Sequence, residues 1–304
     1  VSVPPGEPCI GSYMASRIFN KRMVVDVRDD WEEAVLKRTR RMLTRRLYRF
    51  YKMLFNTIFQ RSYFIITVSP TLVQRIKERG AKEVRLVPNG ADVTLFRPKS
   101  SNERANIRES LGLREEDFVF VYAGMVGSYY RIDVVIKALQ RLVREQRLSN
   151  LKLLVIGVGD NAREYLDLTR RLRLTDHVRF LGEKPRDEVA KILACCDMGV
   201  IPYDDDPLWL SAYPTKLFEY SASGLPTIIS IVKGSDSEKL IDENKIGFSV
   251  EPMKIEQMTE VMARAYNDRK RLKQMRLNAR QLALEKFNRE KIAREFAEML
   301  RAES

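Results

Sequence analysis

The chain has 304 residues, and at about 150 residues per domain this length predicts two domains. Hydrophobic residues make up 44% and charged residues 31%, a balance that excludes disordered, collagen-like and disulfide-scaffold proteins. No apolar run approaches the ~18 residues that a membrane-spanning helix needs. Three cysteines and one histidine are little material for a zinc site or a disulfide set, and no secretory leader is visible. We therefore expect no metal, no cofactor and a reducing, cytoplasmic compartment.

The net charge of +13 is concentrated in residues 34–77, which hold eleven basic side chains and no acidic one. Placed on a helix, this segment has an apolar face and an opposite basic face. The apolar positions are Leu43, Leu47, Phe50, Tyr51, Leu54, Phe55 and Ile58, and the basic positions are Arg38, Arg41, Arg45, Arg49 and Lys52.

Three interpretations of this basic segment are open. It is either a core helix with a solvated basic back, a face that docks on anionic lipid, or a surface that grips nucleic acid. Because the chain carries no recognition-helix, RNA-binding or zinc-finger motif, we expect no nucleic-acid partner. A membrane surface is the functional interpretation that we favour.

Strand and helix patterns alternate along the chain. The expected strands are Met23–Val27, Tyr63–Val68, Val84–Val87, Phe118–Ala123, Leu151–Ile156, Val178–Leu181, Met198–Ile201, Thr227–Ser230 and Phe248–Val250. The expected helices between the later strands are Ile132–Arg147, Ala162–Leu172, Asp187–Ala194, Lys216–Ala222, Ser235–Asp242 and Ile255–Tyr266. This order predicts an α/β protein with parallel sheets covered on both faces, in which the first of two domains is short.

Ligands in such sheets bind outside the carboxyl ends of the strands, and three loops there carry suitable residues. Gly124 and Gly127 follow the first strand of the second domain, where small residues let backbone amides approach a phosphate. Gly157 and Gly159 follow the next strand, although a tight turn needs glycine in any case.

The third loop leads into Thr215-Lys216-Leu217-Phe218-Glu219. A lysine in the first turn of a helix is suited to holding a diphosphate, and a carboxylate three residues later accepts hydrogen bonds from sugar hydroxyls. The alternative is that Lys216 and Glu219 are only an exposed pair on one helix face.

These segments resemble family 4 of the retaining glycosyltransferases, which have the two-domain GT-B fold, and in particular the branch that builds polysaccharides and glycolipids. The most specific match is VRLVPNGADVTLFRP (Val84–Pro98), which is similar to the interdomain segment of the family. VFVYAGMVG, LKLLVIGVGDN, VRFLGEKPRDEV and YPTKLFEYSASGLPTII resemble successive parts of the nucleotide-binding domain, and MVVDVRDDW and FNREKIAREFAEML resemble an acceptor-domain strand end and the C-terminal helix.

The resemblance implies a GT-B fold with two Rossmann-like domains: an incomplete acceptor-side domain at 1–98, a donor-binding domain at 99–286 and a returning helix at 287–304. It implies a retaining, metal-independent hexosyl transferase that moves a sugar from a nucleotide-diphosphate donor to a lipid-linked or polysaccharide acceptor. Such an enzyme would be cytoplasmic and peripheral at the inner face of the cell membrane, with an anionic membrane surface as a partner.

The resemblance also implies roles for individual residues. Lys216, with Thr215 and Leu217, would hold the donor diphosphate, and Glu219 would bind donor hydroxyls. Arg131 is the remaining cation of its loop and the candidate for a second phosphate contact. Glu183 and Lys184 would flank the base, and Gly124, Gly127, Gly157 and Gly159 would line the phosphates. Arg28 and Asp29 stand where the family often has a histidine near the reacting carbon, so they are the candidate catalytic residues.

Two departures from the family keep a second function open. Ser211 replaces the first of two paired glutamates, and Asp204, Asp205 and Asp206 are candidates for its role. Val1–Pro8 already resembles the middle of the acceptor domain, so a longer gene product or a second polypeptide would supply the preceding part. The alternative is therefore a nucleotide-sugar-binding fragment that has no transfer activity alone, and a sugar-nucleotide epimerase is less favoured.

Charge reversal at Arg41, Arg45 and Arg49 tests the membrane interpretation. We expect the triple variant to lose binding to anionic vesicles, because each basic residue near such a surface contributes about 1 kcal/mol. Co-sedimentation measures this, with neutral vesicles as the control. Unchanged sedimentation with anionic vesicles would contradict the docking face.

Overall fold

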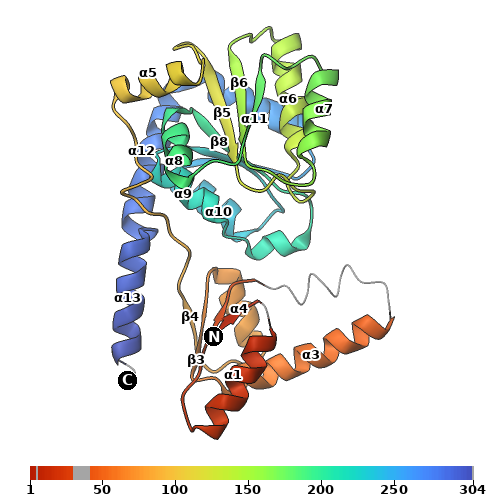
Figure 1. Ribbon diagram of the computed structural model, residues 1–304, viewed down its shortest axis with the longest axis vertical. Helices are drawn as coiled ribbons and strands as arrows, with labels where there is room; N and C mark the ends of the chain where they lie inside the picture. Colours follow the sequence, from red (N-terminus) through yellow and green to blue (C-terminus); the bar gives the residue numbers. More distant parts are fainter. Residues whose placement is uncertain (5, 30–41, 303–304) are drawn as a thin grey trace. The chain divides into compact units, whose positions relative to one another are not determined.

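The computed structural model describes residues 1–4, 6–29 and 42–302, which divide into two compact units (Figure 1). The N-terminal unit consists of Val1–Asn89 with two short later segments, Pro207–Tyr213 and Ser235–Ser237. The C-terminal unit contains the remainder of the described chain. The boundaries expected from the sequence, 1–98, 99–286 and 287–304, remain predictions.

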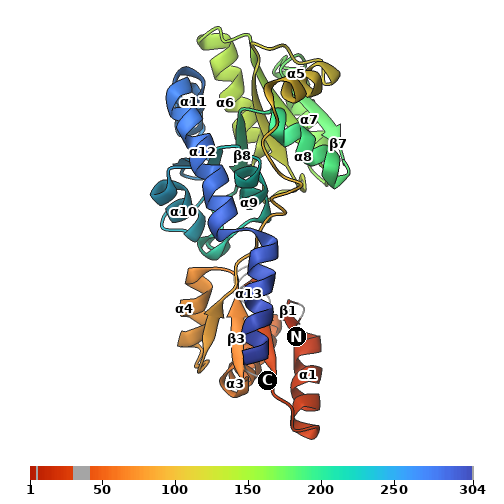
Figure 2. The same cartoon turned by 90° about the vertical axis from the view of Figure 1, so that its left-hand side faces the viewer.

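The N-terminal unit is built on a parallel four-stranded sheet in the order β1–β2–β3–β4. Its strands are short: β1 is Ser2–Val3, β2 is Val24–Val27, β3 is Phe64–Thr67 and β4 is Val84–Leu86. Helix α1 (Glu7–Ile18) packs on β1, and α4 (Pro70–Glu78) packs on β3 and β4 at the other end of the sheet (Figure 2). Helix α4 begins at a capped end, where the hydroxyl of Ser69 accepts a hydrogen bond from the amide of Leu72 and Pro70 occupies the first position.

The basic amphipathic segment forms α3 (Met42–Arg61), but only its second half is a core helix. Phe55, Ile58 and Phe59 are buried with β2 and β3. Leu47 and Phe50, which the sequence places on the same apolar face, are 62% and 59% exposed. Among the described side chains, the core-helix interpretation therefore holds for Phe55, Ile58 and Phe59 but not for Leu47 and Phe50.

The C-terminal unit contains a parallel six-stranded sheet in the order β10–β9–β8–β5–β6–β7. Its strands are β5 (Phe118–Ala123), β6 (Leu151–Ile156), β7 (Val178–Gly182), β8 (Met198–Pro202), β9 (Thr227–Ser230) and β10 (Gly247–Val250). The chain builds the sheet from β5 to β6 and β7 on one side, and then crosses over to add β8, β9 and β10 on the other side of β5. The switch point therefore lies between the neighbouring strands β5 and β8. This is the doubly wound arrangement, whose switch point is a preferred place for ligands.

Helices cover both faces of this sheet (Figure 1). Phe118, Phe120 and Tyr122 on one face of β5 share an apolar cluster with α6 (Ile132–Glu145) and α11 (Ile255–Asn267). On the other face, the ring of Tyr220 from α9 (Thr215–Ala222) fills the place where a Cβ on Gly199 would lie. The other helices of this unit are α5 (Ser101–Ser110), α7 (Ala162–Arg171), α8 (Arg186–Cys195), α12 (Arg269–Lys286), α13 (Arg289–Ala302) and, from Glu238 onward, α10 (Asp236–Asn244). A 3-10 turn, η1 (Pro207–Ser211), lies in a later segment that belongs to the N-terminal unit.

All nine expected strands are present within one or two residues of their predicted ends, and so are the six expected helices between the later strands. The sequence did not indicate β1, α1 or α5. Helix α5 begins with a capping box, in which the amide of Glu103 donates to the hydroxyl of Ser100 and the amide of Ser100 donates to the carboxylate of Glu103.

A buried ionic network ties α5 and α12 to the start of β8. The carboxylate of Asp197 accepts hydrogen bonds from Arg104 at 2.6 Å, from Arg108 at 2.9 Å and from the amide of Val119 at 2.9 Å. Arg276 of α12 approaches the same carboxylate at 3.4 Å, and burial lowers its pKa to about 10. One carboxylate therefore serves three guanidinium groups, so its loss leaves buried charge uncompensated.

We expect Asp197→Asn to lower the free energy of unfolding by about 3 kcal/mol or more, because it removes the charge that compensates buried Arg108. The matched control is Glu116→Gln, which breaks an exposed pair with Arg114 and is expected to cause no measurable change. Urea unfolding followed by circular dichroism measures both. Equal midpoints for the two variants would contradict the role assigned to Asp197.

Candidate functional site

The carboxyl ends of β5 and β6 form the floor of the candidate site. The amide of Gly124 donates to the carbonyl oxygen of Ile156 at 2.9 Å, and the amide of Val126 donates to that of Val158 at 2.9 Å. Gly157 has a φ of +127°, and an added Cβ there would overlap the carbonyl oxygen of Gly124. The two glycine loops therefore pack backbone against backbone.

Helix α9 places Lys216 and Glu219 at this edge of the sheet. The Lys216 ammonium lies 3.8 Å from the ring centroid of Tyr130 and 4.5 Å from that of Tyr122, and it donates to the Tyr122 hydroxyl at 3.2 Å. Burial lowers the pKa of Lys216 to about 7, although Glu219 opposes this shift. The pair is thus not an exposed helix-face pair, which was the alternative interpretation of the sequence.

Glu219 is held by an arginine from the neighbouring helix. Arg186, the first residue of α8, donates to its carboxylate at 2.8 Å and lies 5.3 Å from the ring centroid of Phe96. Burial raises the pKa of Glu219, and the Arg186 guanidinium opposes this shift. The side chain of Glu219 is 19% exposed, so its carboxylate remains accessible to a ligand.

A cavity of about 520 Å³ brings these elements together, and all of its lining lies in the C-terminal unit. It is lined by Phe96, Ala123, Gly124, Met125, Ile156, Gly157, Val158, Glu183, Lys184, Arg186, Val189 and Glu219. Five of the residues singled out in the sequence therefore share one cavity at the switch point: Gly124, Gly157, Glu183, Lys184 and Glu219. This combination of glycine loops, two cations and two carboxylates suits a ligand with phosphate and hydroxyl groups.

Other sequence-predicted residues lie outside this lining. Arg131 donates from two guanidinium nitrogens to Asp133, at 2.8 and 3.0 Å, so its charge is already paired. Leu217 is fully buried, whereas Thr215 is exposed at the start of α9. Gly127 and Gly159 belong to the two loops but do not border the cavity, and an added Cβ on Gly159 would overlap the carbonyl oxygen of Val126.

Arg28 and Asp29, the candidate catalytic residues, follow β2 in the N-terminal unit. Arg28 donates to Asp26 at 2.9 Å and to Asn89 at 2.8 Å, so its guanidinium is bonded within that unit. Ser211 is buried in η1, where its hydroxyl donates to the carbonyl oxygen of Leu208 at 3.4 Å. In the described ranges, no group of three or more His, Cys, Asp or Glu side chains is placed to hold a metal ion.

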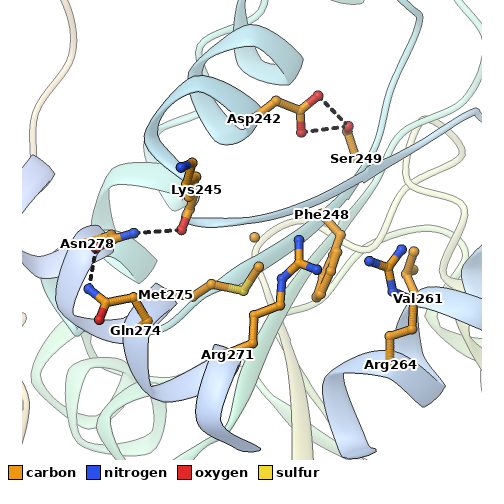
Figure 3. Close-up of a pocket in the computed structure, with 11 residues that line it drawn as sticks. Asp242, Lys245, Phe248, Ser249, Val261, Arg264, Arg271, Gln274, Met275 and Asn278 are labelled. Carbon is orange, nitrogen blue, oxygen red and sulfur yellow. Dashed lines mark hydrogen bonds between the residues drawn. The ribbon is translucent and has the colours of Figure 1, made fainter. Parts of the chain in front are cut away.

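A second groove of about 530 Å³ lies at the β10 edge of the same sheet (Figure 3). Arg264 and Arg271 lie on either side of Phe248, 5.2 and 5.1 Å from its ring centroid. Ser249, which also lines the groove, donates a hydrogen bond to the carboxylate of Asp242. None of the candidate site residues from the sequence analysis lines this groove.

The sequence reasoning missed Arg186, Phe96 and Tyr122. Arg186 had a detectable signal, because it opens a helix directly after Glu183 and Lys184. Phe96 lies in the segment Val84–Pro98 but reads there as an ordinary apolar residue. Tyr122 belongs to a continuous apolar strand, so nothing in the sequence distinguishes it from a core residue.

The C-terminal unit is therefore a doubly wound α/β domain, and the cavity at its switch point is suited to a phosphate-containing ligand. The Glycosyl transferases group 1 family model matches residues 103–282, more than half of the chain, and the chain belongs to this family.

Two curated relatives and one solved structure illustrate the relationship. The uncharacterized glycosyltransferase MJ1607 of Methanocaldococcus jannaschii is 27% identical over 236 residues, 76% of this chain and 58% of that protein. The lipopolysaccharide 1,2-N-acetylglucosaminetransferase of Salmonella typhimurium is 27% identical over 247 residues, 78% of this chain and 61% of that protein. The crystal structure of Anabaena Alr3699/HepE in complex with UDP has a TM-score of 0.78 at 18% identity and covers 99% of this chain and 78% of that chain.

This likeness establishes the GT-B type of fold with its two parallel sheets, of which the N-terminal one is small. The chain spans between about a third and three-fifths of the length of the curated relatives that it matches.

We expect Gly157→Ala to lower the free energy of unfolding by at least about 2 kcal/mol more than Gly182→Ala, because only the former drives a Cβ into the Gly124 carbonyl. Gly182 is a matched control, since its φ is also positive at +68° and its Cβ would meet nothing within 4 Å. Urea unfolding of both variants measures the difference. Equal losses would show that the two loops can separate without cost.

Proposed function

We propose that the chain is a retaining glycosyltransferase that moves a hexose from a nucleotide-diphosphate donor to a lipid-linked or polysaccharide acceptor. The observation that carries this proposal is the cavity at the switch point, which combines two glycine loops with Glu219 and Arg186 and has Lys216 behind its wall. The name of the Salmonella relative, which specifies a lipopolysaccharide, supports an acceptor of this class.

The chemistry requires charge to develop on a departing nucleotide diphosphate. Lys216 stands in the first turn of α9, where its ammonium adds to the positive end of the helix dipole. A fixed cation aimed at a leaving group lowers the barrier without a metal, so metal independence belongs to the proposal. Gly124, Gly127, Gly157 and Gly159 would let the phosphates approach the loop backbone closely, because they carry no side chain. Thr215 and Leu217 would shape the start of α9, and Arg131 would need to leave Asp133 to contribute.

The other end of the donor is assigned to Glu219, Glu183 and Lys184. An ionised carboxylate only accepts hydrogen bonds, so Glu219 suits the hydroxyls of a ribose or hexose. Glu183 and Lys184 border the same cavity and would flank the base. Arg28 and Asp29 remain the candidates for the acceptor side, with Asp29 taking the acceptor proton.

A second function, binding of a nucleotide sugar without transfer, is favoured by one observation. Ser211, which stands where the family has its first paired glutamate, offers a hydroxyl that is bonded to Leu208 and no carboxylate. A second polypeptide would then supply the missing chemistry. Release of UDP from UDP-glucose, assayed with and without a polyprenyl-phosphate-linked acceptor, distinguishes a transferase from a binding module.

Peripheral association with the inner face of the cell membrane is part of the proposal and rests on α3. Leu47, Phe50 and Met53 are exposed on this helix, and so are the neighbouring Arg46 and Arg49. Exposed apolar side chains flanked by cations are the pattern of a helix that lies on anionic lipid. Of the residues in the vesicle experiment above, Arg41 and the side chain of Arg45 lie outside the described part of the chain. Among the described helices, none combines the length and the apolar character needed to span a bilayer.

Calorimetric titration with UDP, GDP, ADP and CMP tests the donor site. We expect micromolar binding of one nucleotide and a loss of about 10- to 100-fold in Lys216→Ala, because one charge-assisted contact contributes about 1.5–3 kcal/mol. Lys191→Ala is the control, since Lys191 forms only an exposed pair with Asp187. Failure of all four nucleotides to bind, or equal affinity in Lys216→Ala, would contradict the proposal.

A further inference from the structure

The ammonium of Lys216 lies in a tyrosine cage made by Tyr122 from β5 and Tyr130 from the loop before α6. Both rings are within cation–π distance of the ammonium, with ring centroids 4.5 and 3.8 Å away. The cage is itself supported, because the ring of Tyr130 packs on Tyr203 with centroids 5.3 Å apart and its carbonyl oxygen accepts from Tyr165 at 2.8 Å. The cage is therefore part of the packed structure of the C-terminal unit.

A chain of hydrogen bonds connects the cage to the cavity. Lys216 donates to the hydroxyl of Tyr122, and this hydroxyl donates to the carbonyl oxygen of Met125. Met125 and Gly124 line the cavity, whereas Lys216 does not. A Cβ on Gly124 would lie 2.9 Å from the lysine nitrogen, so the ammonium stands directly behind the loop that borders the cavity.

We propose that Tyr122 and Tyr130 are positioning residues, which hold the Lys216 ammonium behind the Gly124–Met125 loop and present it to the diphosphate of a nucleotide sugar. This inference rests on the proposed function and adds the residues that control its central cation. It assigns a role to Tyr122 and Tyr130, which the sequence does not distinguish from ordinary apolar residues.

The cage also controls the charge of the lysine. The groups that face it are Tyr122 on β5, Tyr130 on the loop before α6, Tyr203 after β8 and Glu219 on α9, which is itself paired with Arg186 on α8. With the pKa lowered to about 7 by burial, part of the lysine is neutral at neutral pH. A diphosphate beside it favours the ammonium, so binding takes up a proton when the pH is near or above 7.

The affinity for a nucleotide sugar consequently depends on pH in a defined direction. Below about pH 6 the lysine is already charged, and affinity is constant. Above pH 7 each pH unit costs up to about tenfold, because the proton must first be bound. UDP-glucose is the appropriate probe, since its diester phosphates do not titrate in this range.

The experiment combines two readouts on the full chain. NMR titration of ¹³C-labelled lysine, with Lys216 assigned by its loss in Lys216→Arg, gives its pKa without any ligand. Calorimetry at pH 6 and pH 8.5 gives the affinity for UDP-glucose, GDP-glucose and ADP-glucose. The variants are Tyr130→Ala, which opens the cage to water, and Tyr130→Phe, which keeps the ring as a matched control. Each Tyr130 variant is also made in a Lys216→Ala background.

We expect the wild-type lysine to titrate near pH 7 and the Tyr130→Ala lysine at least one unit higher, with Tyr130→Phe unchanged. We expect Tyr130→Ala to weaken nucleotide-sugar binding about tenfold at pH 6, and to have no further effect in the Lys216→Ala background. This loss of effect separates a positioning role from a merely structural one.

Two results would refute the role proposed for Tyr122 and Tyr130 without refuting the proposed donor site. One is a wild-type Lys216 that titrates at its ordinary value, and the other is a Tyr130→Ala penalty of equal size with and without Lys216. If instead the lysine titrates near pH 7 and none of the three nucleotide sugars binds, the proposed function fails, and the role assigned to the cage fails with it.

Discussion

The candidate site depends on one close contact, in which Gly157 of the loop after β6 meets the backbone of Gly124 after β5. Because neither loop leaves room for a side chain at this point, two adjacent strand ends present bare backbone at the same edge of the sheet. The cavity, the approach of Lys216 behind Gly124 and the position of Met125 all follow from it. Close packing of the two loops is therefore one reason for a glycine at position 157.

The electrostatics of the site are arranged around burial. Lys216 and Glu219 come from one turn of α9, yet they have different neighbours: tyrosine rings for the lysine and Arg186 for the glutamate. Burial shifts both groups toward their neutral forms. Arg186 counteracts this for Glu219, whereas the tyrosines offer Lys216 only ring faces and one hydroxyl. The lysine is therefore the more easily switched of the two charges.

Much of the fold could be predicted from the sequence because its strands are continuous apolar runs. Phe118–Ala123 and Leu151–Ile156 are buried on both faces, and short continuous apolar runs bounded by turn residues indicate such strands. Helix α5 was missed, because its residues are predominantly polar and show no apolar face in the sequence. The outcome for α3 could not be predicted, because helical spacing shows which side chains share a face but not how far the supporting sheet extends.

Site residues that belong to local sequence motifs could be predicted. Site residues that act through contacts between distant elements could not. Gly124, Gly157 and Glu219 follow from strand ends and a helix start. Arg186 reaches Glu219 across 33 residues, and Tyr122 reaches Lys216 across 94. No spacing rule connects such pairs. Arg131 shows the converse, because a cation that reads as available in the sequence is paired with Asp133 two residues later.

The enclosure of Lys216 also links folding to proton release. The unfolded chain keeps a lysine protonated up to its ordinary pKa, whereas the folded chain releases the same proton near pH 7. Between these values the unfolded state binds more protons, so the free energy of unfolding rises with pH in this window and carries the cost of the buried charge below it. Burial of this cation therefore lowers the stability of the folded chain below pH 7. A bound anion that neutralises the cation would restore this stability.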